Sequence, residues 1–280
     1  MSARLTRVLE HDPLAAQVAP DVRAFVALAV KITARPADVT ADDVRAALAA
    51  AHSPRQYFDA VGVMVAFNFI TRVVSALGVE PEIPGWMRRF ETLRQIGLRV
   101  VGLFFRFFVD LRPKGVHGPT PAEHIAGFRR LFADLRLGAL PAWVERLAFA
   151  PPLLAALHEF LEALVRRDAA GAVGLDRHQF VAVGRTVLQT IPNAVTLRAL
   201  VDASEPAACA GRTTLVTRFA GDMALHPYKL TRDRVDELRA AGLDDADVLD
   251  LAATAALWCA AARLEVLTGC LPDLTPGAGA

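Results

Sequence analysis

The 280-residue sequence lacks the cysteine patterns of disulfide-bonded and zinc-binding proteins. Its three cysteines, Cys209, Cys259 and Cys270, form no Cys-x-x-Cys pair and no His/Cys cluster at metal-ligand spacing. An odd number of thiols is typical of a reducing compartment, so we expect a cytoplasmic protein. We expect no metal and no cofactor, because no Gly-rich phosphate loop, Gly-x-Ser-x-Gly motif or catalytic triad is visible.

Charge of one sign and strand patterning are also missing. The chain has 31 basic and 30 acidic residues and so no general attraction for phosphate, and we expect no nucleic-acid partner. Few segments alternate at period two, whereas Ala, Leu, Arg and acidic residues recur at helical spacing. With 54% hydrophobic residues to supply a core, the composition predicts an all-α globular protein.

Long uncharged apolar runs are absent as well, and residues 1–16 lack the apolar region of a secretory signal, so we expect no export. No run reaches about 18 uncharged apolar residues, which argues against a membrane span; Asp59 and Arg72 bracket the first long stretch. Residues 86–111 combine five arginines with several phenylalanines, a pattern that a basic helix on a membrane surface would share. The phenylalanines cover too much of the circumference for that, so we expect core or oligomer contacts and no membrane partner.

What the sequence does contain is an internal similarity. The apolar stretch 57–78 is similar to the stretch 248–269. A shift of 191 residues aligns 19–78 with 210–269 without a gap. Eleven of the 60 aligned pairs are identical, and they fall mainly on helix caps, stops and charged positions. They include Pro36/Pro227, Thr40/Thr231, Asp59/Asp250, Arg72/Arg263 and Gly78/Gly269. We therefore predict that the two segments descend from a duplication.

Capping residues and helix breakers divide the chain into expected helices. These are 21–33, 40–51, 54–78, 86–111, 120–135, a short helix after Pro141, 151–167, 175–190, 193–203 and the repeat helices from Ala210, the last opening at Asp244 and Asp245. In helix 54–78, Asn68, Arg72 and Ser75 form one polar stripe, which predicts a buried helix with one wet edge. The stripe is open to two interpretations, ligand contact or hydrogen bonding to neighbouring backbone groups.

Other polar clusters give weaker indications. His158, Glu159 and Glu162 share a helical face, as in a metal or acid–base site, but no second His follows at i+4. Cys209 lies near an expected helix start, where the helix dipole lowers a thiol pKa, so it is a candidate nucleophile as well as an incidental thiol.

The segments TADDVRAALAAAHSPRQYFDAVGVMVAFNFITRVVSALGV and LTRDRVDELRAAGLDDADVLDLAATAALWCAAARLEVLTG resemble the C-terminal half of the AhpD-like, or carboxymuconolactone decarboxylase-like, all-helical fold. FNFITR followed by ALG is similar to the Phe-Asn-x-x-Asn-Arg stretch of the peroxidase-related branch, and residues 140–164 resemble its lead-in helices. The resemblance covers 113–271 as one full unit and 19–80 as a half unit. It implies an AhpD-like helical bundle and assembly into a homo-oligomer.

The resemblance also implies where an alkylhydroperoxidase site would lie. Redox members of the family carry Cys-x-x-Cys-x-x-x-His at a helix start, with a glutamate about three turns earlier. Aligned on this chain, the glutamate position is Gln179, the cysteines are Ile191 and Ala194, and the histidine is Arg198. Because all four functional residues are replaced, we predict a redox-inactive structural or small-ligand-binding member of the family.

Four domain assignments follow: 1–84 as an N-terminal AhpD-like half unit, 85–112 as a connecting Arg/Phe-rich helix, 113–274 as the AhpD-like domain and 275–280 as a disordered tail. The candidate pocket residues for a small-molecule ligand are Asn68, Arg72, Asn193 and Arg263. The alternative function is a divergent peroxidase or other small-acid enzyme that uses Cys209 or a repurposed pocket.

Overall fold

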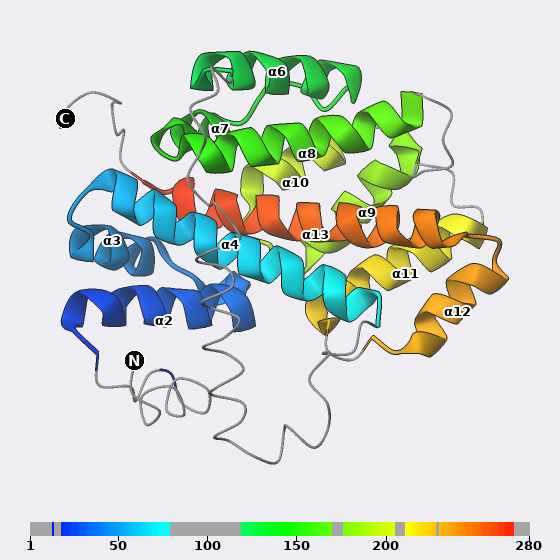
Figure 1. Cartoon of the computed structure of the whole chain (residues 1–280), viewed down its shortest axis with the longest axis horizontal. Coiled ribbons are helices and arrows are strands. Elements are labelled where there is room, and N and C mark those ends of the chain that lie inside the picture. Colours follow the sequence, from blue (N-terminus) through cyan, green and yellow to red (C-terminus); the bar gives the residue numbers. More distant parts are fainter. Residues whose placement is uncertain are drawn as a thin grey trace, which may run out of the picture. The chain divides into compact units, whose positions relative to one another are not determined.

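The computed structural model describes Pro13 and residues 18–78, 119–169, 176–204, 211–227 and 230–271, and helices are the only regular secondary structure among them. The predicted all-α class is therefore confirmed. The α-helices are α2 (Pro20–Ala34), α3 (Ala41–Ala50), α4 (Pro54–Ala76), α6 (Pro121–Asp134), α7 (Ala142–Arg146), α8 (Pro151–Ala169), α9 (Arg177–Gln189), α10 (Val195–Asp202), α11 (Gly211–Leu225), α12 (Arg232–Ala240) and α13 (Asp245–Thr268) (Figure 1). Short 3-10 turns cover Pro36–Asp38 and Leu147–Phe149.

The predicted helix starts agree with the observed caps. The side chains of Thr40, Thr120, Asp176 and Asp244 each accept a hydrogen bond from the backbone N–H three residues later, and in each case that later side chain bonds back to the cap. Gly78 follows α4 with a φ of 62°, a left-handed conformation that favours glycine. The expected helix 86–111 and the predicted domain boundaries lie outside the described residues.

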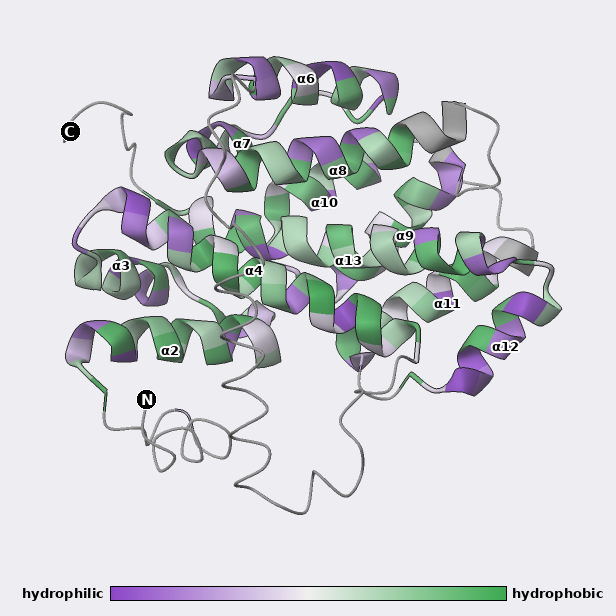
Figure 2. Cartoon of the chain, viewed as in Figure 1, coloured by the Kyte–Doolittle hydropathy of each residue, from purple (hydrophilic) through white to green (hydrophobic). Residues whose placement is uncertain are grey.

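Helix α13 lies at the centre of the described helices and contacts α4, α7, α9, α10 and α11 (Figure 1). Nearly all of its residues from Val248 to Thr268 are buried, including the charged residues Arg263 and Glu265. A helix that is apolar around its whole circumference must be enclosed by other elements. Figure 2 shows the contrast with α12, which is largely hydrophilic and contacts fewer elements.

By length and hydropathy alone, α4 and α13 would each be able to cross a membrane. The expectation that no segment is apolar enough to cross a membrane therefore holds only if the segment must contain no charged residue. In α13, 94% of the most apolar 18-residue stretch is buried inside the protein, as is typical of a core helix. In α4 only 28% of the corresponding stretch is buried.

The two similar segments have the same helix boundaries. Helices α2, α3 and α4 begin at residues 20, 41 and 54, and α11, α12 and α13 begin at residues 211, 232 and 245, each 191 residues later. Helices α4 and α13 pack against each other in antiparallel directions. The Tyr57 hydroxyl near the start of α4 donates to the carbonyl oxygen of Leu267 near the end of α13 at 2.7 Å.

The prediction that the polar stripe of α4 faces solvent is wrong. The stripe points into the protein, and an apolar face of the helix points outward. Asn68 and Arg72 are only 7% and 4% exposed, whereas the exposed face carries the large apolar residue Phe67, which is 66% exposed. The polar stripe tolerates burial because its groups bond inside the fold. The Asn68 amide donates to the Thr33 hydroxyl at 3.0 Å and to the Met64 carbonyl at 2.9 Å.

Candidate functional site

The residue at the predicted glutamate position, Gln179, is a helix-capping residue. Its backbone N–H donates to Asp176 Oδ1 at 2.7 Å, and its side-chain Oε1 accepts from the Asp176 backbone N–H at 3.2 Å. These reciprocal bonds hold the start of α9. The side chain of Gln179 is therefore engaged in holding local structure.

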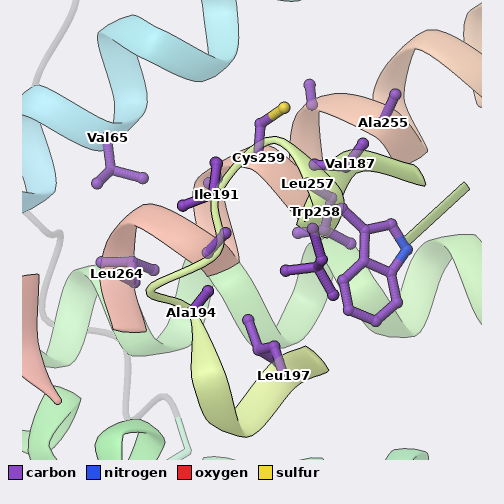
Figure 3. Close-up of a cluster of buried hydrophobic side chains, with 14 of the residues drawn as sticks. Val65, Val187, Ile191, Ala194, Leu197, Ala255, Leu257, Trp258, Cys259 and Leu264 are labelled. Carbon is purple, nitrogen blue, oxygen red and sulfur yellow. The ribbon is translucent and has the colours of Figure 1, made fainter. Parts of the chain in front are cut away.

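The two positions of the family's cysteines lie inside the core. Ile191 and Ala194 are 1% and 0% exposed, and they lie among Val65, Leu197 and Leu264 (Figure 3). Arg198, at the position of the histidine, is exposed, and its Nη1 donates to the Pro192 carbonyl oxygen at 3.3 Å. These positions supply packing and a surface contact, so no described thiol stands at the start of α10.

Glu265 occupies the site at which the α10 amides would stabilise an anion. Helix α10 has no capping side chain at Ala194. Instead Glu265, reaching from α13, accepts hydrogen bonds from the backbone N–H groups of Thr196 at 2.5 Å and Leu197 at 2.9 Å. The Glu265 side chain is 5% exposed. A carboxylate is favourable there because helix N-termini carry unpaired amides and a partial positive charge.

A polar pocket of about 350 Å³ opens beside this cap. It is lined by residues of the loop before α3, the start of α10 and the end of α13, including Thr40, Asn193, Thr196, Glu265 and Cys270. The Asn193 amide nitrogen donates to the carbonyls of Pro36 at 2.9 Å and Val39 at 3.3 Å, while its Oδ1 atom is buried without a hydrogen-bond partner. Two residues that line the pocket therefore carry acceptors: the Asn193 amide oxygen is buried without a partner, and the two Glu265 carboxylate oxygens already bind the α10 amides.

Cys270 is the described thiol nearest to this pocket, but its environment does not activate it. The residue is exposed, but its Sγ donates to the Val266 carbonyl oxygen at 3.7 Å, and partial burial of the thiol raises its pKa above the ordinary value. A raised pKa lowers the thiolate fraction at neutral pH. Cys259 is buried within α13, and Cys209 lies outside the described residues.

The remaining candidate pocket residues bind backbone and side-chain groups within the fold. Arg72 Nη1 donates to Asn68 Oδ1 at 2.8 Å and to the Asn68 carbonyl oxygen at 3.2 Å. Arg263 is 1% exposed and donates to the carbonyls of Ile32 at 3.2 Å and Cys259 at 3.0 Å. Burial lowers the pKa of Arg263 to about 10. Of the four predicted pocket residues, Asn193 lines the polar pocket, whereas Asn68, Arg72 and Arg263 connect α4 and α13 to α2 or to their own helices.

A buried histidine pair was not predicted from the sequence. His124 Nδ1 and His158 Nδ1 are 3.2 Å apart, and the residues are 4% and 9% exposed. Burial lowers the pKa of His158, which favours the neutral form of that ring in its contact between α8 and α6. The sequence indicated a cap before His124 and placed His158 on one helical face with Glu159 and Glu162, but no sequence pattern links two histidines 34 positions apart. Within the described ranges no group of three or more His, Cys, Asp or Glu side chains could hold a metal ion.

Comparisons with protein-family models, curated proteins and solved structures found no match for this chain.

Proposed function

We propose that this chain is a redox-inactive member of the AhpD-like, or carboxymuconolactone decarboxylase-like, superfamily, and that it acts as a cytoplasmic structural or small-ligand-binding protein. The N-terminal half unit and the C-terminal half of the full unit would then be two copies of one ancestral helix set. The common offset of 191 residues at the starts of three helix pairs supports the duplication. The equivalent residues Arg72 and Arg263, both buried and both bonded to a carbonyl one turn earlier, also support it.

The observation that carries the loss of redox activity is the position of the Glu265 carboxylate. A reactive thiolate at a helix start depends on the free amides and the dipole of that helix. Here Glu265 binds the amides of Thr196 and Leu197. A thiolate placed beside them would meet a like charge, which raises its pKa.

The same arrangement supports a ligand with hydrogen-bond donors. Glu265 and the unpartnered Asn193 Oδ1 are acceptors, and the pocket of about 350 Å³ has room for a small molecule. An ammonium or hydroxyl group would satisfy the buried Asn193 oxygen, whereas a carboxylate would face Glu265. We therefore propose a small amine or polyol as the class of ligand.

Two assays test this function. Purified protein supplied with an alkyl hydroperoxide and a dithiol should show no turnover above that of buffer, and turnover abolished by Cys209→Ser would instead establish the alternative, a displaced single-thiol peroxidase. Ligand-observed NMR with a fragment set of amines, alcohols and carboxylates should give signals for the first two classes. Asn193→Leu should remove these signals, whereas Asn68→Leu, outside the pocket, should leave them; carboxylate-selective binding would refute the proposed ligand class.

A further inference from the structure

Two buried histidines face each other across the interface between α6 and α8. His124 Nδ1 on α6 lies 3.2 Å from His158 Nδ1 on α8, and both residues are nine-tenths or more buried. Their rings make a T-shaped contact with the centroids 5.2 Å apart, and the Phe128 ring packs against His158 at the same centroid distance. The pair is therefore a buried polar link between the two helices.

This link is a hydrogen bond in only some protonation states. A neutral imidazole has one N–H donor and one acceptor nitrogen, whereas an imidazolium has two donors. One Nδ1–H can therefore donate to the other Nδ1 as long as at least one of the two rings is neutral. When both rings are protonated, both Nδ1 atoms are donors, and two cations face each other across 3.2 Å. Like charges so close in a buried site repel strongly.

Packing around His158 also opposes a charge on its ring. The Nε2 atom lies against the α6 backbone at Gly127, where an added Cβ atom would be only 2.0 Å away. This side of the ring is therefore in contact with α6 and not with water. Loss of water lowers the pKa of His158, because burial disfavours the charged form.

The charged groups around the pair come from both helices. Glu162 and Glu159 on α8 favour a positive charge on His158, whereas Arg130 on α6 opposes it. A charge on His124 opposes it as well. His124 lies at the end of the first turn of α6, where the helix dipole disfavours a cation. The neighbouring carboxylate on α6, Glu123, is engaged in the cap of that helix.

Helix α6 is attached to the fold mainly through this interface. It packs on α8, and Figure 1 shows it at the edge of the described helices. An ion pair between Arg129 and Glu145 at 2.7 Å also joins α6 to α7, but both side chains are about half exposed, and such pairs contribute little. Phe128 and Phe132 on the buried face of α6 line an apolar cavity of about 40 Å³, together with residues of α8 and α13. Helix α6 therefore covers this cavity.

We propose that the pair His124–His158 is a proton-operated latch, which holds α6 on α8 at neutral pH and releases it when both rings are protonated. Release gives each imidazolium water as a hydrogen-bond partner and uncovers the apolar cavity. The open state takes up a proton that the closed state excludes. Opening is therefore favoured as the pH falls below about 6.5, the ordinary imidazole pKa, and is opposed above it.

Hydrogen exchange of the full chain, followed by mass spectrometry between pH 7.5 and 5, tests the latch. Protection factors, which correct for the pH dependence of intrinsic exchange, should fall for the α6 amides by up to about tenfold per pH unit below about 6.5, since opening takes up one more proton. The α13 amides should stay more protected than those of α6 at every acidic pH, because they exchange only when the whole bundle unfolds. Equal protection of α6 and α13 at pH 5, or α6 protection that does not change with pH, would overturn the latch.

A substitution identifies the group that titrates. His158→Gln keeps a polar side chain that does not titrate, so α6 protection should become nearly independent of pH. His178→Gln is the matched control, since His178 is exposed on α9, and it should keep the wild-type pH dependence. A wild-type pH slope in His158→Gln would overturn the proposal.

NMR of the wild type with ¹³C-labelled histidine needs no variant. The His124 and His158 rings should become protonated over the pH range in which α6 opens. Opening of α6 while both rings remain neutral would show that the pair does not control it.

Discussion

Removal of the Glu265 carboxylate is the most direct test of the proposed role of the α10 start. In Glu265→Ala the buried Leu197 N–H loses its acceptor, which costs about 1–3 kcal/mol. The Thr196 residue is exposed, so water replaces part of its bond, and loss of this cap costs about 1 kcal/mol. The sum predicts a destabilisation of about 2–4 kcal/mol.

Glu265→Gln removes the negative charge of the side chain but keeps its shape. The carboxamide keeps one acceptor oxygen but places an NH₂ group against the second amide, so we expect a smaller loss of about 1–2 kcal/mol. The control is Glu159→Gln on α8, an exposed position that should change stability by less than about 0.5 kcal/mol.

Urea denaturation at constant m-value measures the change in the free energy of unfolding. The midpoint temperature of thermal unfolding should fall by about 3–7 °C for Glu265→Ala, since the unfolding entropy of a chain of this length is about 0.6 kcal/mol per kelvin. Hydrogen exchange adds a local readout, because the Leu197 amide should lose protection in both Glu265 variants and keep it in the control. If both Glu265 variants unfolded like Glu159→Gln, with an unchanged Leu197 amide, the assignment of Glu265 as the cap of α10 would be refuted.

Three further predictions address other parts of the fold. Burial lowers the pKa of His158 below its value in the unfolded chain, so the unfolded state binds the proton more tightly. The free energy of unfolding should therefore fall as the pH drops below about 6.5. His158→Gln should flatten this part of the pH–stability profile, and an unchanged slope would contradict the assignment. Gly184→Ala should cost about 1–3 kcal/mol in urea unfolding, because its Cβ would lie 2.4 Å from the Trp258 ring, whereas Gly221→Ala, whose Cβ would meet only a methyl group at 3.4 Å, should be neutral or stabilising. Cys270 is exposed, but its raised pKa lowers the thiolate fraction, so it should alkylate more slowly at pH 7 than an unperturbed peptide thiol, as followed by peptide-resolved mass spectrometry. Labelling at pH 7 as fast as that of the peptide thiol would disprove this.

The helix boundaries were predictable from the sequence because they depend on local chemistry. Thr40, Thr120 and Asp244 cap helices that begin at the next residue, and Gly78 adopts the left-handed conformation expected after α4. Capping bonds and backbone conformation involve residues at most four positions apart, so their pattern is legible in the chain itself.

Which face of a helix is buried was decided by tertiary packing. The polar stripe of α4 indicated a wet edge, yet Asn68 is buried because α2 supplies the hydroxyl of Thr33 as its partner. A polar group is buried at low cost wherever another element satisfies it, and no local pattern reports whether that element is present.

The candidate site depended on tertiary structure even more strongly. Asn193 was predicted as a pocket residue. The role of Glu265 was not predicted, because it caps α10 only through the packing of α13 beside the start of α10, 69 positions from Thr196. The pair formed by His124 and His158 arose in the same way, from two helices with no shared motif. The sequence alone determined the helical composition, the caps and the 191-residue offset, because these depend on neighbouring residues or on direct comparison. The acceptor pocket and the exposed apolar face of α4 were decided by the packing of distant helices, since only that packing determines which groups meet and which stay uncovered.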